Sequence, residues 1–173
     1  GSWKDDYRNG FGTLTIENGD VFSGEWLDGM LTGAGKYQYN SGDIYEGEFI
    51  NGRYNGEGTF TFSNGDVYTG NWKYDKMDGI GRMNYSNGNI YEGEWADGLN
   101  HGDGTFTFSN GDVYEGEFIN DSMSGYGRYQ YSNGDSYQGM YLNRLKSGYG
   151  IYTYKNNDTY SGNWLNDHKE NFG

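Results

Sequence analysis

The feature that most constrains the fold of this chain is a repeat of 23 residues that extends through the whole sequence. Two copies are nearly identical: FTFSNGDVYTGNW, from Phe60 to Trp72, and FTFSNGDVYEGEF, from Phe106 to Phe118, which begin 46 residues apart. A pair of aromatic residues around a central glycine recurs at this spacing, with the glycines at Gly24, Gly47, Gly70, Gly93, Gly116, Gly139 and Gly162. A fixed period between about 20 and 50 residues indicates an array of small stacked units rather than one globular core.

Two further glycine columns follow the same period. One is a Gly-x-Gly pair, seen first at Gly10 and Gly12, and the other is a single glycine, seen first at Gly19 and replaced only at Asn157. The chain starts and stops within a repeat. We therefore expect residues 1–173 to form a single array of about seven repeats with partial repeats at both ends, and to be a fragment of a longer protein.

Composition alone would suggest disorder. Leu, Ile, Val and Phe make up about 15 % of the chain, and its formal charge is −13. Aromatic residues nevertheless make up 19 % of the chain and recur at fixed positions of the 23-residue repeat. Such regular spacing is not expected of an unfolded segment. The chain has no cysteine, which excludes a disulfide scaffold, and no apolar run near the roughly 18 residues of a membrane span. We expect a cytoplasmic protein.

The local patterns predict an all-β fold. Each repeat has two alternating runs around Asn-Gly or Ser-Gly, such as Asn64-Gly65, for which a two-residue hairpin turn is the first interpretation. The other connection, such as Ile50–Asn55, is expected to be longer. Glycine at 32 of 173 positions argues against helices. We predict an open antiparallel array of β-hairpins that forms one elongated, twisted and grooved sheet.

The turn decides where the aromatic columns lie. With a two-residue loop at Asn64-Gly65, residues whose numbers sum to 129 would pair, and aromatic side chains would occupy both faces. A bulge near the turn would instead bring the columns together on one face. The sequence leaves both arrangements open.

The run YEGEWADGLNHGDGTFTFSNGDV, from Tyr91 to Val113, resembles the consensus of the MORN repeat, the membrane occupation and recognition nexus motif. The resemblance covers the whole chain. It implies hairpins stacked into an open, grooved sheet that serves as an interaction scaffold, in association with the cytoskeleton or a membrane. In some members of this family the groove holds a helical segment of a partner.

Catalysis is not expected, and neither is a bound metal or cofactor. Paired carboxylates lie two residues apart, on one face of a strand, at Glu46, Glu48, Glu92, Glu94, Glu115 and Glu117. Acid–base chemistry would need unlike surroundings for the members of a pair, whereas the repeat gives them like ones. We interpret these acidic rows as a solvated face. The aspartates that follow the turn glycines, such as Asp66, are expected to accept backbone hydrogen bonds rather than bind calcium.

Charge also narrows the range of partners. The chain carries 12 basic against 25 acidic residues, which disfavours nucleic acid and makes direct binding to an anionic membrane less favourable than binding to protein. We expect a non-catalytic scaffold whose aromatic groove accepts a basic, amphipathic peptide or helix. The expected groove residues are Tyr45, Phe49, Tyr68, Trp72, Tyr91, Trp95, Tyr114, Phe118 and Tyr137.

Three other functions stay open from the sequence. Exposed edge strands at the two ends would support a homodimer. Rows of aromatic side chains would also suit a glycan- or choline-binding module. A phospholipid-associated module is the third alternative.

Overall fold

The computed structural model describes residues 1–170 and divides the chain into two compact units, one spanning Gly1–Ser86 and one beginning at Asn87. Every regular element among the described residues is a β-strand. None of these residues belongs to a helix that could span a membrane. The same hairpin pattern recurs in both units.

The first unit holds eight strands: β1 (Ser2–Lys4), β2 (Tyr7–Thr15), β3 (Val21–Leu27), β4 (Met30–Gln38), β5 (Ile44–Ile50), β6 (Arg53–Thr61), β7 (Val67–Lys73) and β8 (Lys76–Asn84). The described part of the second unit holds another eight: β9 (Ile90–Ala96), β10 (Leu99–Thr107), β11 (Val113–Ile119), β12 (Ser122–Gln130), β13 (Ser136–Leu142), β14 (Leu145–Thr153), β15 (Thr159–Leu165) and β16 (His168–Lys169).

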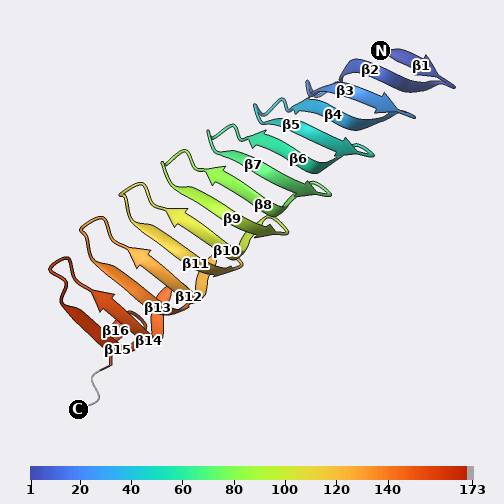
Figure 1. The fold of residues 1–173 in the computed structure, drawn as a ribbon. Helices are drawn as coiled ribbons and strands as arrows, with labels where there is room; N and C mark the ends of the chain where they lie inside the picture. The colour runs from blue at the N-terminus through green and yellow to red at the C-terminus, as the bar shows by residue number, and fades with distance from the viewer. Residues whose placement is uncertain (171–173) are drawn as a thin grey trace. The chain divides into compact units, whose positions relative to one another are not determined.

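Within each unit every strand pairs antiparallel with the next strand along the chain. Figure 1 shows this succession of hairpins, two strands to each repeat. The prediction of an all-β, open antiparallel array of hairpins is therefore confirmed.

The two kinds of connection differ from those predicted. The Asn64-Gly65 turn is not a two-residue loop, because Phe62 and Asp66 still pair through the Phe62 N–H and the Asp66 carbonyl, 2.9 Å apart. Three residues close this loop, and its glycine has a φ of +94°, as in a hairpin that ends in a glycine bulge. The Asn64 side chain stabilises the loop by accepting a hydrogen bond from the Asp66 N–H at 2.9 Å.

The connection predicted to be longer is the two-residue turn. Ile50 pairs with Arg53, and the two residues between them, Asn51 and Gly52, have φ values of +53° and +77°. Positive φ at both central positions defines the type I′ turn, whose twist matches that of the flanking strands. The lengths predicted from the sequence for both connections were thus wrong. The cause is the same in both cases, because Asn-Gly occurs in two-residue and in three-residue hairpin loops.

The three-residue loop sets the register. Phe60 pairs with Tyr68, so paired residue numbers sum to 128, one less than a two-residue loop would give. The aromatic columns consequently lie on one face of each unit, which confirms the second of the two arrangements left open by the sequence. We call this the aromatic face, and we call the opposite side, which carries Glu46 and Glu48 on β5, the polar face.

The core lies on the aromatic face and consists mainly of aromatic rings. In five of the repeats one tyrosine has no exposed surface: Tyr45, Tyr68, Tyr91, Tyr114 and Tyr137. Each contacts the aromatic residue four positions later edge to face; the ring centroids of Tyr45 and Phe49, for example, are 5.2 Å apart. Tyr45 also contacts Trp72 of the next repeat in the same way, at 5.3 Å. Within each unit such ring contacts therefore link neighbouring repeats, and the rings replace an aliphatic core.

Glycine pairs make room for these tyrosines. Gly116 on β11 pairs with Gly127 on β12, and the Tyr114 ring lies over Gly127, where an added Cβ would be 2.5 Å from the tyrosine hydroxyl. The Tyr114 ring therefore reaches across from its own strand, β11, to the glycine of the next strand.

Hydrogen bonds join successive turns at both edges. At the three-residue loops, Asp66 Oδ1 accepts from the N–H of Ser86, twenty residues later, at 2.7 Å. Carboxylates in the same column accept equivalent bonds at Asp20, Asp43, Asp112 and Asp135. At the two-residue turns, Asp121 Oδ1 accepts from the N–H of Asn100 at 2.8 Å, and its own N–H donates to the Asn100 carbonyl. The expected backbone hydrogen bonds of the aspartate column are thus present, and they join neighbouring repeats.

Candidate functional site

A groove crosses the polar face of the second unit from β9 to β13. Its floor is backbone at the glycine row, where Gly93 pairs with Gly104, and Gly116 with Gly127. Its volume is about 600 Å³, which lies within the range of sites that hold small ligands or several peptide side chains. The charged and polar side chains of the wall are Glu92, Asp103, Thr105, Glu115, Tyr126, Arg128 and Gln138.

The first unit carries a comparable groove of about 520 Å³ at the equivalent place. Gly58 and Gly70 form its floor, and Glu57, Thr59 and Ile80 are among its walls. The groove therefore follows from the repeat itself: a row of residues without side chains lies between two rows of residues with them. Its walls are more acidic in the second unit.

The nine aromatic residues predicted to line a groove lie on the aromatic face, beneath this surface. Tyr45, Tyr68, Tyr91, Tyr114 and Tyr137 are fully buried, and Phe49, Trp72, Trp95 and Phe118 are between 2 % and 6 % exposed. In each unit the structure brings its members of this set together in a ladder of rings. In these buried positions the rings hold the sheet together. Contact between these rings and a partner stays a prediction.

The six predicted acidic residues are all exposed, on the polar face. Glu92 and Glu115 line the groove of the second unit. The carboxylate of Glu94 lies beside Gly102, where an added Cβ would be 2.6 Å from its Oε2. Glu46 of the first unit forms an ion pair of 2.8 Å with Lys36 on the neighbouring strand.

Sequence reasoning did not identify Asp103, Tyr126, Arg128 or Gln138 as site residues. Each of them alternates with a glycine or a buried ring, so each belongs to the polar face once the register is known. The signal that could have identified two of them is the Gly-x-Gly column. Its central residue, such as Asp103 or Tyr126, projects on the opposite side from the glycines and forms a groove wall.

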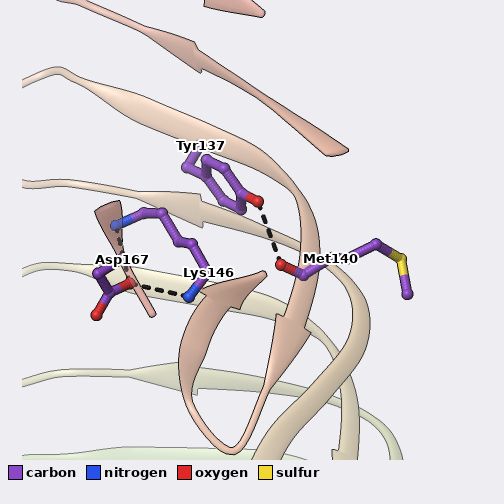
Figure 2. A network of polar contacts seen from close by, with 4 residues as sticks. All are labelled: Tyr137, Met140, Lys146 and Asp167. Atoms are coloured by element: carbon purple, nitrogen blue, oxygen red, sulfur yellow. Dashed lines mark hydrogen bonds and ion pairs between the residues drawn. The ribbon is translucent and has the colours of Figure 1, made fainter. Parts of the chain in front are cut away.

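The polar groups beneath the groove are held by hydrogen bonds. Figure 2 shows the buried Tyr137 hydroxyl donating to the carbonyl of Met140 at 3.2 Å. Burial raises the pKa of Tyr137 to about 12, so the phenol stays a neutral donor at physiological pH. In the same view Asp167 accepts from the backbone N–H of Lys146 at 2.9 Å and lies 3.5 Å from its ammonium.

The ammonium group of Lys146 also lies between aromatic rings of the core. Its Nζ atom is 5.5 Å from the ring centroid of Tyr131, 5.4 Å from that of Tyr137 and 5.5 Å from that of Trp164. This is the geometry of a cation–π site. A lysine of the chain itself therefore occupies the place where a cationic ligand could contact these rings.

The groups at the groove are of the kinds that recognise a ligand through hydrogen bonds and charge. The residues described by the structure include no group of three or more His, Asp or Glu side chains that could hold a metal ion. Backbone hydrogen bonds at the loops are the main cause that lowers the pKa of Asp66 and of Asp43, whereas at Asp135 the main cause is the hydrogen bond from the Tyr152 hydroxyl. The groove itself combines carboxylates, amides, hydroxyls and one guanidinium on a rigid backbone floor, which is suited to recognition of an extended ligand.

Comparisons with solved structures agree with the fold. The TCP domain of Drosophila melanogaster SAS-4, solved in complex with a proline-rich motif of Ana2, is similar with a TM-score of 0.56 and 14 % identity, over 90 % of this chain and 84 % of that one. The TCP10 domain of Danio rerio CPAP is similar with a TM-score of 0.51 and 12 % identity, over 88 % and 72 % of the two chains. At these identities the likeness concerns the fold alone.

A search of curated protein sequences gave no match. The family model of the MORN repeat, in contrast, matches seven consecutive segments: residues 1–21, 22–44, 45–67, 68–90, 91–113, 114–136 and 137–159. The boundaries of these segments follow the 23-residue period described above. The chain therefore belongs to the MORN repeat family.

Proposed function

We propose that this chain is a non-catalytic interaction scaffold and that the groove on its polar face binds an extended, basic segment of a partner protein. The observation that carries the proposal is the groove of the second unit, in which Glu92, Asp103 and Glu115 line a floor of bare backbone. A rigid trough whose walls carry three carboxylates against one guanidinium, that of Arg128, favours a ligand that is long, narrow and mainly of positive charge.

The shape of the groove supports a peptide as the ligand. It crosses five strands, so at a strand spacing of about 4.8 Å its lining spans roughly 20 Å. An extended peptide rises about 3.3 Å per residue, and six or so residues would cover that length. The solved SAS-4 domain in complex with a proline-rich motif shows that a sheet of similar fold can bind a peptide.

Charge supports a basic partner. Opposite charges across an interface speed association and select between partners. A nucleic acid or an anionic membrane would meet repulsion from the acidic walls. The glycan- and choline-binding alternatives would need accessible rings, whereas the rings of the ladder are buried and Lys146 is already among them.

A titration with defined peptides tests the proposal. The probe is a fluorescein-labelled peptide that alternates arginine and serine, and its counterpart alternates glutamate and serine; fluorescence anisotropy measures the binding of each at low and high salt. We expect the arginine peptide to bind, more weakly as salt rises, and the glutamate peptide not to bind. Failure of the arginine peptide to bind at low salt would contradict the proposal.

A matched pair of variants localises the binding. Glu92→Gln with Glu115→Gln removes two charges from the groove and uses the residue found at Gln138 in the same column. The control, Asp158→Asn with Glu170→Gln, removes two exposed charges outside it. We expect the groove variant to bind about threefold to tenfold more weakly, because exposed ion pairs contribute up to about 1 kcal/mol each. Equal losses in both variants would show general charge attraction instead of a groove site.

A further inference from the structure

Four exposed apolar side chains lie close together on the polar face of the second unit, on β12, β13 and β14. Tyr126 is 53 % exposed, Met140 42 %, Tyr149 60 % and Ile151 41 %. Tyr126 on β12 pairs directly with Met140 on β13. Gly139, which precedes Met140, pairs with Gly150 on β14. Gly150 lies between Tyr149 and Ile151, so these two side chains are close to Met140. We call this set the apolar patch.

The patch departs from the repeat at two of its columns. The positions in register with Met140 hold polar residues in the other strands of this kind, at Glu25, Glu48, Asn71, Glu94, Glu117 and Asn163. The positions in register with Ile151 are Thr13, Lys36, Thr59, Arg82, Thr105 and Arg128. The fold therefore does not require an apolar side chain at Met140 or Ile151.

Met140 takes no part in the aromatic core. In Figure 2 its carbonyl accepts the Tyr137 hydroxyl, while its side chain points away from Tyr137 and Lys146. A Cβ added to Gly148 of the next strand would lie 3.7 Å from the Met140 Cβ, at van der Waals distance. An unbranched, polarisable thioether held at the surface between two tyrosines is suited to contact with another apolar group.

The patch is continuous with the acidic groove. Tyr126 belongs to both, because it lines the groove and pairs with Met140. The groove is acidic where it crosses β9 to β11, and the patch follows at β12 to β14. At the boundary Arg128 lies opposite Glu115, so the charge on the polar face changes from negative to positive before the surface becomes apolar.

We propose that the groove and the apolar patch form one bipartite site for a partner segment in which basic residues are followed, at a fixed offset, by large apolar residues. This inference rests on the proposed function of the groove and adds the chemistry of the partner. Its basic residues lie over Glu92, Asp103 and Glu115, and its apolar residues cover Met140 and the two tyrosines. A neutral or acidic residue faces Arg128 between them.

Strand geometry sets the offset. The centre of the acidic part is β10 and the centre of the patch is β13, three strands away, or about 14 Å at about 4.8 Å per strand. An extended peptide covers about 14 Å in roughly four residues. The basic and apolar centres of the partner segment are therefore about four residues apart along its chain.

Charge complementarity decides between the occupants of this surface. A second copy of this chain would place one acidic groove beside another, with the chain at a net charge of −13, and this repulsion disfavours self-association through the patch. A segment with both basic and apolar residues satisfies both halves of the surface at once.

Three labelled peptides test the proposal on the full chain by fluorescence anisotropy. The bipartite peptide is Arg-Ser-Arg-Ser-Leu-Ser-Leu, whose two centres are four residues apart; the basic peptide has serine in place of both leucines; the long-spacer peptide has four more serines between the arginines and the leucines. Each is made in both chain directions. We expect the bipartite peptide to bind about tenfold more tightly than the basic peptide, since burial of each leucine adds free energy. We expect the long-spacer peptide to lose most of this gain.

Substitutions taken from the chain's own repeats localise the gain. Met140→Asn, Tyr149→Ala and Ile151→Thr introduce the residues found at Asn71, Ala34 and Thr105 in the same columns, and none of them changes the charge. We expect this triple variant to bind the basic peptide as the wild type does and to lose the gain of the bipartite peptide. The matched control is Ile119→Ala, which removes a side chain that is 52 % exposed and uses the residue at Ala96; it should keep the gain.

The outcomes separate the two proposals. If the basic peptide binds and the leucines add nothing, the bipartite site is wrong and the groove proposal stands. If neither peptide binds, the groove proposal fails and the bipartite site fails with it. If light scattering shows a wild-type dimer that the triple variant lacks, the patch covers a second copy of this chain, which overturns the proposed occupant.

Discussion

The ring of Tyr114 lies on Gly127 of the neighbouring strand, so close that a methyl group on this glycine would stand 2.5 Å from the tyrosine hydroxyl and 2.6 Å from the ring. The tyrosine is fully buried and its hydroxyl donates to the Glu117 carbonyl at 3.0 Å. The ring therefore has no free direction in which to move. The same relationship joins Tyr91 to Gly104 and Tyr137 to Gly150.

Substitution of Gly127 by alanine should destabilise the second unit by about 1–3 kcal/mol, the usual range for overpacking a filled core. Urea denaturation followed by circular dichroism measures the change. The φ of Gly127 is not positive, so backbone strain does not contribute. In a double-mutant cycle with Tyr114→Leu, the two losses should sum to more than the loss in the double variant, because the smaller side chain removes the clash. Additive losses would assign the effect to something other than the ring.

The aspartate of the two-residue turn at Asp121 should stabilise the array through its side chain. It accepts from the Asn100 N–H at 2.8 Å, and its φ of +64° is one that Asp and Asn tolerate better than Ala. Asp121→Ala should therefore lower the free energy of unfolding by about 1–2 kcal/mol, through the lost hydrogen bond and the backbone strain. Asp121→Asn keeps both features and should stay close to the wild type. A loss of equal size in the asparagine variant would show that the charge, and not the hydrogen bond, matters.

Stability should fall in acid as the aspartates of the three-residue loops take up protons. The backbone hydrogen bond from Ser86 is the main cause that lowers the pKa of Asp66, and the bond from Ser63 does the same for Asp43. A carboxyl with a lower pKa in the folded chain adds stability above its unfolded pKa of about 3.9, and this stability is lost as the pH falls through the folded pKa. Thermal unfolding measured from pH 7 down to about pH 2 should show this loss below about pH 5.

Asparagine separates the hydrogen bond from the charge in that experiment. Asn89 already occupies this column, and its Oδ1 accepts from the Ser109 N–H at 2.9 Å. The double variant Asp43→Asn with Asp66→Asn should therefore be about as stable as the wild type at neutral pH. Its melting temperature should fall less steeply with decreasing pH in the acid range. An unchanged slope would place the acid sensitivity in other carboxyls.

The lysine at position 146 should act mainly through its hydrocarbon stem. Its side chain is 14 % exposed and lies against Tyr131, Tyr137 and Trp164. Lys146→Ala removes this packing and should lower the free energy of unfolding by about 2 kcal/mol, whereas Lys146→Met, the residue found at Met123 in the same column, should cost less than half as much. Urea denaturation of both variants measures the difference. Equal losses would show that the ammonium group carries the whole effect.

The sequence was sufficient for the fold class because the period and the alternation are both periodic signals that no single substitution obscures. It was not sufficient for the turns. Asn64-Gly65 is compatible with a two-residue or a three-residue loop, and the choice depends on hydrogen bonds to Asp66 and to the next repeat, which a local pattern does not contain. A shift of one residue in register moves a whole column of side chains to the other face.

The candidate site could not be predicted for the same reason: its side chains are assigned to a face only once the register is known. Tyr68 and Trp72 were predicted to line a groove because aromatic rows are common at binding surfaces, but a ring next to a glycine column has an alternative, which is to lie on that glycine. The groove walls were missed because the sequence does not distinguish Asp103 and Tyr126 from other residues between two glycines. Only the register places both on the polar face, on strands that flank β11.

The division of the sheet into an aromatic face and a polar face has a consequence for how such a chain can change. The ring contacts lie on one side and the turn hydrogen bonds at the two edges, so a substitution of a groove wall residue should have little effect on folding. Each repeat contributes its own few wall residues. On the proposed function, a lineage or a protein engineer could therefore change the specificity one repeat at a time while the fold stays the same.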